Sequence, residues 1–433
     1  MTIKKITNFD YLLLLIVLIL TGIGILFIYS SGVNSDGVSV SKEYIKQIIW
    51  AITGVILLIA TTFYDYQKFK DRTFLLFIIA LLFLVYTPIF GHYSKGAKSW
   101  IGIGEFGIQI SEFTKVIYIL YLAYYLDKSK NENPFKRFIK ASCIMAIPMG
   151  LILLQPDLGT ASVYIPIFLI MCFIAGLPLR FVFGLLSIVL LTLVFTLLPL
   201  WEKAIIQHPG IATKIFSNKS VSALIFLSLA TTVIIAAIGY MRVKRKYYYW
   251  VTYVLILISL SFGIALVGIR VLKPYQMMRL IIFLDPNVDP LNAGWHILQS
   301  MIAIGGGGTF GMGFLKGTQS HYRFLPQQST DFIFSILSEE WGFVGGVAVF
   351  MLYLLFFIRI LLIMKHTDDL YEKLIASGIL GMFFFHFIVN VGMVMGIMPI
   401  TGIPLLLLSY GGSSLWTAMI ATGLLISIDL RRV

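Results

Sequence analysis

The feature that most constrains this chain is the recurrence of apolar stretches about 20 residues long. A helix of that length crosses a hydrocarbon core roughly 30 Å thick. Of the 433 residues, 59% are hydrophobic and only 12% are charged, whereas soluble domains carry about 25% charged residues. A long chain with so few charges has a surface solvated by lipid. The sequence therefore predicts an all-α polytopic membrane protein.

The apolar runs, separated by polar breaks, predict twelve transmembrane helices. The first run is too long for the apolar core of a signal peptide and no small-residue cleavage site follows it, so we expect a membrane helix there. The expected ranges are 11–30, 46–64, 74–90, 110–126, 139–155, 159–177, 180–200, 222–240, 249–270, 331–364, 373–398 and 405–429.

The basic residues orient these helices. With Lys4 and Lys5 placed in the cytoplasm, most of the 33 Lys and Arg residues fall in loops on that same side, as the positive-inside rule requires. Both termini are therefore predicted to be cytoplasmic, and the net charge of +13 reports topology rather than nucleic-acid binding. Cys143 and Cys172 lie in apolar segments, so neither a disulfide nor a thiol metal site is expected.

Three segments on the outer side are longer or less regular than a connector requires. They are 91–108, the break at 155–159, and 271–330. Long connections are usually functional or disordered. The last segment is too apolar and aromatic for disorder, so we expect it to form a large extracytoplasmic loop that packs on the bundle. The whole chain, 1–433, is predicted to be a single membrane domain.

Ionisable residues in or beside hydrocarbon are costly, so each is a functional candidate. They gather on the outer side of the membrane: Glu112 with Lys115 (three apart on one helix face), Asp157, Arg279 in the large loop, Asp331, and Glu339 with Glu340. Each also has a structural interpretation. Thr330 or Asp331 can cap a helix, and Asp157 can do the same. The Glu112–Lys115 pair can simply fasten helices together, and Arg279 can anchor to lipid phosphate.

A run of glycines, 305–308 with Gly311 and Gly313, has two interpretations. It can cradle a phosphate, but the Lys-Ser/Thr ending of a P-loop is missing. A tight turn leading into a packed loop is therefore favoured. His296 and His321 lack metal-site spacing and are interpreted as structural, and the other four histidines form no cluster.

An ordered set of motifs covers nearly the whole chain: GAKSWI (96–101), QISEFTK (109–115), QPDLGT (155–160), FLDP (283–286), AGWHILQS (293–300), FLP (324–326), TDFIF (330–334) and PLLLLSYGGS (404–413). In these motifs the chain resembles the SEDS family (shape, elongation, division and sporulation). Two further motifs, GTQS (317–320) and NVGMV (390–394), resemble the RodA branch more than the FtsW branch.

The chain departs from the family pattern in two places. Ile110 stands where the family commonly has proline before the Ser-Glu pair. The resemblance implies ten helices, and the surplus pair is predicted to be an inserted hairpin at 201–270 around the basic run 242–246.

The resemblance implies a peptidoglycan glycosyltransferase that polymerises lipid II during cell-wall elongation and cell-shape maintenance. It implies the bacterial inner (cytoplasmic) membrane, an extracytoplasmic active site, a class B penicillin-binding protein as the transpeptidase partner, and a divalent cation, Mg or Mn. It makes Asp331 the catalytic aspartate and metal ligand, with Glu112 and Lys115 also catalytic. The expected substrate-binding residues are Trp100, Lys98, Asp157, Arg279, Gln299, Ser300 and Thr330.

The expected reaction is a single inverting displacement. A sugar hydroxyl attacks an anomeric carbon, undecaprenyl pyrophosphate leaves, and an aspartate accepts the hydroxyl proton. Lys98, Lys115 and Arg279 are candidates to stabilise the pyrophosphate as negative charge develops on it. Two other functions stay open: a lipid II flippase, which needs charges along a path through the bundle, and a non-catalytic scaffold of the elongation complex.

Overall fold

The computed structural model describes residues 9–94, 97–103, 106–206, 208, 210–291, 293–322, 324–325 and 327–431. Lys4 and Lys5, used above for topology, lie outside this set, as do Gly96 and Pro326 of the motifs. The chain forms two compact units. Unit 1 comprises Met1–Leu177 and Gln299–Val433, and unit 2 comprises Pro178–Leu298. That the whole chain, 1–433, is a single membrane domain stays a prediction.

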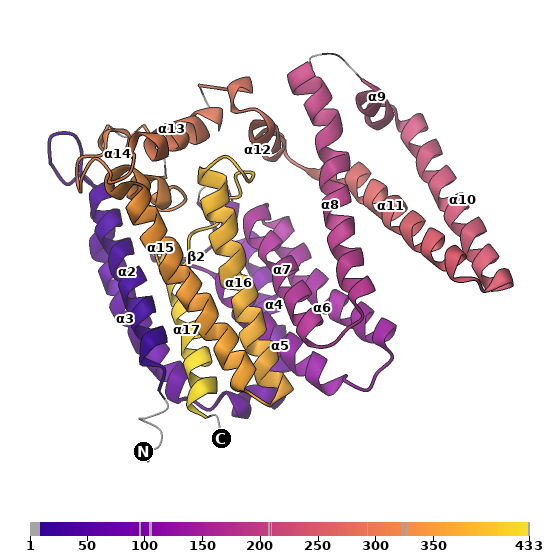
Figure 1. Ribbon diagram of the computed structural model, residues 1–433, viewed down its shortest axis with the longest axis horizontal. Coiled ribbons are helices and arrows are strands. Elements are labelled where there is room, and N and C mark those ends of the chain that lie inside the picture. The colour runs from indigo at the N-terminus through magenta and orange to yellow at the C-terminus, as the bar shows by residue number, and fades with distance from the viewer. Residues whose placement is uncertain are drawn as a thin grey trace. The chain divides into compact units, whose positions relative to one another are not determined.

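Unit 1 is a helical bundle in which segments far apart in sequence lie side by side (Figure 1). Helix α17 packs along α3, and the long α15 packs along α2 and α16. The helices before the unit boundary are α2 (Tyr11–Ser31), α3 (Glu43–Phe63), η1 (Tyr66–Arg72), α4 (Thr73–Phe90), α5 (Ile110–Lys128), α6 (Pro134–Leu154) and α7 (Leu158–Ile174). Those that follow it are α14 (Thr318–His321), α15 (Ile333–His366), α16 (Leu370–Val394) and α17 (Gly412–Leu430).

Unit 2 contains the predicted hairpin. Helix α10 (Lys219–Val243) packs along α11 (Lys246–Val271), which packs in turn on α8 (Leu179–Trp201). The turn between α10 and α11 holds Lys244 in a left-handed conformation, φ 54°. The remaining elements are η2 (Glu202–Ile206), α9 (Ile211–Ser217), α12 (Pro274–Leu284), η3 (Pro286–Val288) and the start of α13 (Ala293–Gly306), which crosses the unit boundary.

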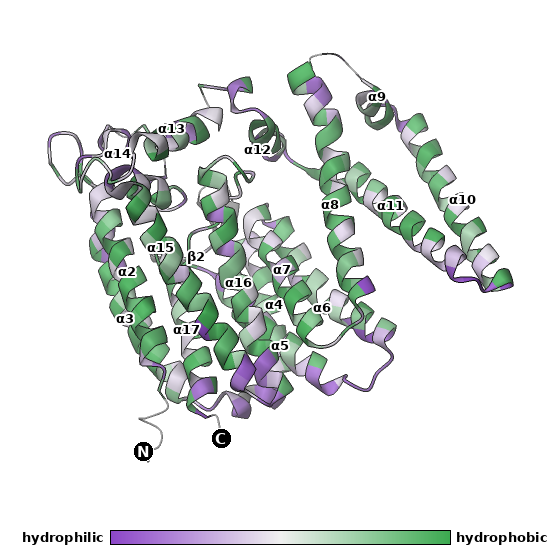
Figure 2. Ribbon diagram, in the orientation of Figure 1, coloured by the Kyte–Doolittle hydropathy of each residue, from purple (hydrophilic) through white to green (hydrophobic). Residues whose placement is uncertain are grey.

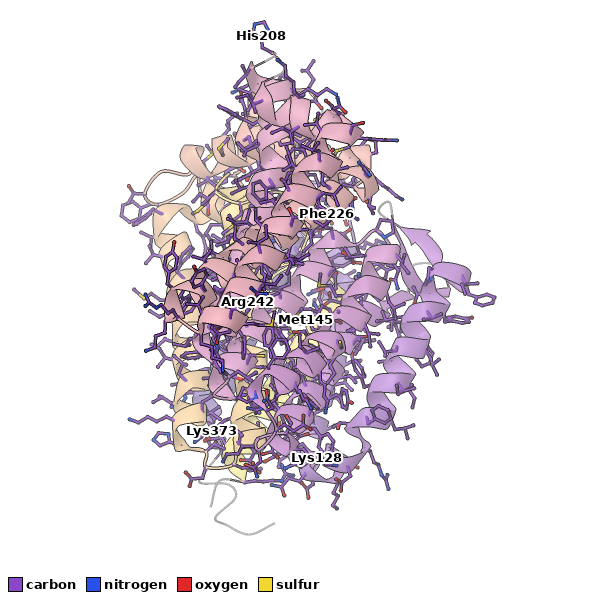
Figure 3. All side chains as sticks on the ribbon, turned by 90° about the vertical axis from the view of Figure 1, so that its right-hand side faces the viewer. Lys128, Met145, His208, Phe226, Arg242 and Lys373 are labelled. Atoms are coloured by element: carbon purple, nitrogen blue, oxygen red, sulfur yellow. The ribbon has the colours of Figure 1, made fainter. Side chains whose placement is uncertain are left out.

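The helices confirm a polytopic membrane protein. Within the described residues, ten are long and apolar enough to cross a membrane, and hydrophilic residues concentrate near helix ends and connections (Figure 2). Two further predicted spans correspond to the more polar α5 and to the shorter α7, so the total of twelve stays a prediction. Lys128 and Lys373, both assigned to cytoplasmic loops, lie at the same end of unit 1 (Figure 3).

The segment 91–108 was expected to be a loop, but it forms a small antiparallel sheet. Its strands are β1 (His92–Ser94), β2 (Ala97–Ile103) and β3 (Phe106–Gln109), in the order β1-β2-β3. Trp100 on β2 pairs with Gln109 on β3, and Gly107 lies directly against the Trp100 ring. The sheet therefore leads directly into α5.

Helix α17 begins at Gly412, seven residues after its predicted start. The preceding residues are buried but not helical, and Leu407 has φ 74°. We call residues 401–411 the 401–411 segment. Leu405–Leu408 are as apolar as a helix, but the segment follows an irregular path that contacts with neighbouring helices, described below, help to hold.

The glycine-rich run is a packed turn, as favoured above, because it fills a break in α15. Gly342 has φ 66° inside that helix. In an unbroken helix the amides of Phe343 and Val344 would bond to the carbonyls of Glu339 and Glu340. Here those amides donate instead to Gly308 and Thr309 at 2.9 and 3.1 Å.

The freed carbonyls of α15 are paired in the same way. Those of Glu339 and Glu340 accept from Met312 and Gly313, both at 3.0 Å. Backbone groups buried without water need such partners. The run thus supplies new hydrogen-bond partners for four backbone groups of α15.

We predict that Gly311→Ala destabilises the protein by about 2 kcal/mol or more. A Cβ at Gly311 would lie 2.0 Å from the carbonyl oxygen of Glu340, and φ is +80°. Gly305→Ala is the matched control, because nothing lies within 4 Å of its Cβ. Thermal unfolding of the two purified variants in detergent measures the difference, and equal unfolding temperatures would contradict this account of the turn.

We predict that a cysteine replacing Arg245 stays unlabelled by an impermeant thiol reagent in intact cells. The positive-inside rule places the α10–α11 turn in the cytoplasm, and Arg245 has an ordinary φ of −84°. The control is a cysteine at Asn218, before α10, which should react. Both belong in a Cys143→Ser background, because Cys143 is an exposed free thiol. Labelling at 245 would refute the topology.

Candidate active site

The Glu112–Lys115 pair predicted from its spacing forms inside the bundle. Lys115 Nζ lies 2.8 Å from Glu112 Oε1, and the two side chains are 0% and 3% exposed. The same Nζ lies 3.1 Å from His386 Nε2 on α16. The imidazole ring also contacts the 401–411 segment, since His386 Nδ1 lies 2.9 Å from the Pro404 carbonyl oxygen. A histidine that the sequence interpretation set aside therefore completes the cluster.

Asp331 lies immediately before α15, partly exposed, and its backbone is held by α16. The Asn390 side-chain amide donates to the Asp331 carbonyl at 3.0 Å and to the Ile403 carbonyl at 2.9 Å. The N-cap of α15 is Phe332, which makes no side-chain cap bond. The capping alternative for Thr330 and Asp331 stays a prediction.

Asp157 has the structural role considered above, because it caps α7. Its Oδ1 accepts from the Thr160 amide at 3.0 Å. Its Oδ2 accepts from the Thr160 hydroxyl at 2.7 Å and from Gln109 Nε2 at 3.0 Å. The backbone N–H of Gln109 donates to Ser413 Oγ at 2.9 Å. Asp157 thereby joins α7, the end of the sheet and the start of α17.

The 401–411 segment is where these contacts meet. In addition to His386 and Asn390, Tyr353 on α15 donates a hydrogen bond to the Leu406 carbonyl. Gln47 on α3 both donates to the Ser409 carbonyl and accepts from the Gly411 amide, at 3.3 and 3.2 Å. The Tyr410 amide donates to the Ser329 carbonyl at 2.8 Å. The segment thus links the Asp331 region to the buried ion pair.

The other predicted site residues in unit 1 differ in burial and lie on different elements. Ser300 is fully buried and packs α13 against α15 and α16, through Ser335 and the Val394 carbonyl, both at 2.7 Å. Gln299 and Thr330 are also buried. Trp100 is half-buried on β2, and Lys98 lies on the same strand opposite Tyr93; the Lys98 side chain is outside what the structure describes.

Arg279 belongs to unit 2, where its guanidinium lies over the Tyr275 ring, 5.8 Å from the centroid. Burial, and then the Arg279 charge, lower the pKa of His296 on α13. His296 is therefore held in its neutral form more firmly than an exposed histidine would be. Arg279 belongs to unit 2 and Asp331 to unit 1, and a shared role for the two stays a prediction.

Glu339 and Glu340 are fully buried carboxylates that bind backbone and hydroxyl groups. Glu339 accepts from the Gln319 amide at 2.7 Å and from Thr318 and Ser320. Glu340 accepts from Ser30 Oγ and from the Leu315 amide at 3.2 Å. These two carboxylates hold the region around α14 against α2 and α15.

Comparison with known proteins decides the family. A family model described as a cell cycle protein, FtsW/RodA/SpoVE, matches residues 10–217 and 210–432. The chain belongs to this family.

Among curated members of the FtsW/RodA/SpoVE family, the chain is 68% identical to "Peptidoglycan glycosyltransferase RodA" of Treponema pallidum, over 100% of both chains. It is 34% identical to "Stage V sporulation protein E" of Bacillus subtilis, over 99% of each. It is 31% identical to "Probable peptidoglycan glycosyltransferase FtsW" of Trichlorobacter lovleyi, over 98% of this chain and 94% of that one. The greater similarity to RodA than to FtsW and the predicted enzyme class, a peptidoglycan glycosyltransferase, are confirmed.

Solved structures support the fold of this family. One is a chain described under "Structural coordination of polymerization and crosslinking by a peptidoglycan synthase complex", with a TM-score of 0.66, 24% identity and 98% coverage of both chains. Another is the crystal structure of the Thermus thermophilus rod shape determining protein RodA, with a TM-score of 0.58, 22% identity and coverage of 98% and 97%. At these identities the likeness shows the fold alone.

The donor groups do not fit a resident metal held by protein ligands alone. Among the described residues, no group of three or more His, Cys, Asp or Glu side chains could hold a metal ion. Mg²⁺ is commonly bound by one or two carboxylates together with substrate phosphates. A predicted divalent cation at Asp331 would therefore depend on oxygen atoms that the substrate supplies.

His386 and Asn390 were missed as site residues. Asn390 lies in a quoted motif but was given no role, and His386 lies 271 positions from its partner Lys115. A signal for His386 was present, because an ionisable residue within an apolar membrane helix is a functional candidate by default. The pairing of His386 with Lys115 had no signal in the sequence, since only the packing of α16 on α5 brings the two residues together.

We predict that Lys115→Met destabilises the protein by about 3–5 kcal/mol, because it leaves the Glu112 carboxylate buried without its cation. Adding Glu112→Gln should recover much of that loss, since the double variant buries no net charge. Each single variant should also lose polymerisation, and the double variant should not regain it. Thermal unfolding and a glycan assay measure the two effects. Stability losses that simply add would show that the side chains are not coupled.

Proposed function

We propose that this peptidoglycan glycosyltransferase polymerises lipid II on the extracytoplasmic face of the bacterial inner membrane, with Asp331 as general base. The observation that carries the proposal is the setting of Asp331. It is partly exposed, its carbonyl is fixed by Asn390, and the next three residues are buried apolar side chains. A carboxylate placed in this way is reachable by a substrate and can accept a proton from its hydroxyl group.

In the proposed step, Asp331 accepts the proton of the attacking sugar hydroxyl. The hydroxyl oxygen bonds to the anomeric carbon of a second lipid II molecule, and the bond from that carbon to pyrophosphate breaks. The pyrophosphate leaves with the electron pair, and the configuration inverts. If a divalent cation takes part, Asp331 would be the residue that holds it, and the ion would supply positive charge for the leaving group.

We infer that the enzyme acts with a class B penicillin-binding protein. Polymerised strands need crosslinking, and crosslinking is a separate transpeptidase reaction. The similar fold found in a peptidoglycan synthase complex supports this proposal. Lipid tails must reach the site from the bilayer, which accounts for a polymerase built as a multi-pass bundle.

The distribution of buried charge favours a polymerase over a flippase. A flippase needs charged groups along a path through the bundle. The buried charged groups described in unit 1 are instead paired locally: Glu112 with Lys115, Glu339 and Glu340 with amides and hydroxyls, Asp10 with Arg359 at 2.8 Å, and Arg137 with Ser129 and the carbonyls of Leu126 and Ala175.

We predict that Asp331→Asn lowers the polymerisation rate by about 10²–10⁴-fold, because an amide does not accept the hydroxyl proton. The variant keeps the backbone carbonyl that Asn390 contacts and a side chain of nearly the same size, so it should fold and associate with the partner. The assay follows glycan made from lipid II by the purified chain with its penicillin-binding partner.

The matched control is Asp369→Asn. Asp369 is exposed and caps α16 by accepting from the Tyr371 amide at 2.9 Å, and asparagine caps as well as aspartate. It should polymerise at the wild-type rate. Substantial polymerisation by Asp331→Asn would show that the general base is another residue.

A further inference from the structure

His386 is a buried histidine that the proposed reaction does not use directly. It lies on α16, 1% exposed, with one ring nitrogen facing Lys115 Nζ at 3.1 Å and the other facing the Pro404 carbonyl oxygen at 2.9 Å. A buried polar ring with a specific partner at each nitrogen is fixed in orientation. Its position between the ion pair and the 401–411 segment calls for an explanation beyond packing.

The two partners determine which nitrogen carries the proton. A carbonyl oxygen only accepts, so Nδ1 must donate to Pro404. An ammonium only donates, so Nε2 must accept from Lys115 through its lone pair. A protonated ring would direct an N–H at the ammonium. The ring is therefore neutral in this arrangement, and it acts as an acceptor for the Lys115 cation.

We propose that His386 is a positioning residue for glycosyl transfer, which holds the Lys115 ammonium in place by accepting its hydrogen bond at Nε2. This inference rests on the proposed function. One turn further along α16, Asn390 bonds to the carbonyls of Ile403 and Asp331. Residues four apart share a helix face. One face of α16 thereby fixes both the cation and the backbone of the catalytic aspartate.

Loss of the acceptor has a defined consequence for the ion pair. Glu112 Oε2 is buried and, among the described residues, has no hydrogen-bond partner. Without His386 Nε2, the ammonium would be drawn to both carboxylate oxygens of Glu112 and away from α16. A shift of about 1 Å in a supporting group can cost about 10²-fold in rate. The Glu112–Lys115 ion pair would remain, but the position of the Lys115 ammonium relative to Asp331 would change.

Two substitutions separate this role from simple packing. In His386→Gln, the longer side chain can place an amide oxygen near the position of Nε2 and accept from Lys115. In His386→Asn, the shorter side chain can place an amide N–H near the position of Nδ1 and donate to Pro404. Each variant keeps one of the two bonds, so similar losses in unfolding temperature are expected.

The expected result is that His386→Gln polymerises lipid II within a few-fold of the wild-type rate. His386→Asn should lose about ten- to a hundredfold, the range expected for losing a hydrogen bond to a charged group. The full chain with its penicillin-binding partner is assayed, and each rate is compared with the unfolding temperature of the same sample.

Other outcomes overturn the inference. Equal rates for the two variants, or a faster His386→Asn, would make His386 a packing residue, as would failure of both to fold. If wild type and Asp369→Asn polymerise and Asp331→Asn does not, the proposed function stands whatever His386 does. A wild-type complex that makes no glycan from lipid II would overturn both proposals.

Discussion

A backbone N–H or C=O in hydrocarbon has no water to bond to, and the architecture of unit 1 follows from that constraint. Most of the chain meets it with helices. Two stretches do not: the break at Gly342 and the 401–411 segment. In the first, backbone groups of the glycine-rich turn replace the helical bonds. In the second, side chains from surrounding helices donate hydrogen bonds to the backbone carbonyls that lack helical partners.

The same constraint explains where the polar side chains of the site lie. Asn390 satisfies the carbonyls of Ile403 and Asp331, and His386 satisfies that of Pro404. Both residues therefore stabilise irregular backbone while they approach the proposed base and the buried cation. Glu339 and Glu340 show the complementary case, in which buried carboxylates accept from amides. Buried charge in this bundle is held by local partners, which suits a fixed site.

Several features were predictable because they depend on neighbours in sequence. The Glu112–Lys115 contact follows from i, i+3 spacing, and the turn formed by the glycine run follows from its composition. The sheet at 92–109 was missed because its strands are short and lack the alternation that predicts a strand. The start of α17 was missed because Leu405–Leu408 are as apolar as a helix, and their irregular path depends on partners from α3, α15 and α16.

By itself, the sequence determined the membrane class, the positions of the apolar helices and the family, because apolar length, charge placement and ordered motifs are local properties. Only the tertiary structure decided which residues share a site. His386 reaches Lys115 across 271 positions, and Asn390 reaches the Asp331 carbonyl across 59. Such contacts depend on how helices pack. A sequence shows that a buried polar residue needs a partner, and only the fold shows which residue provides it.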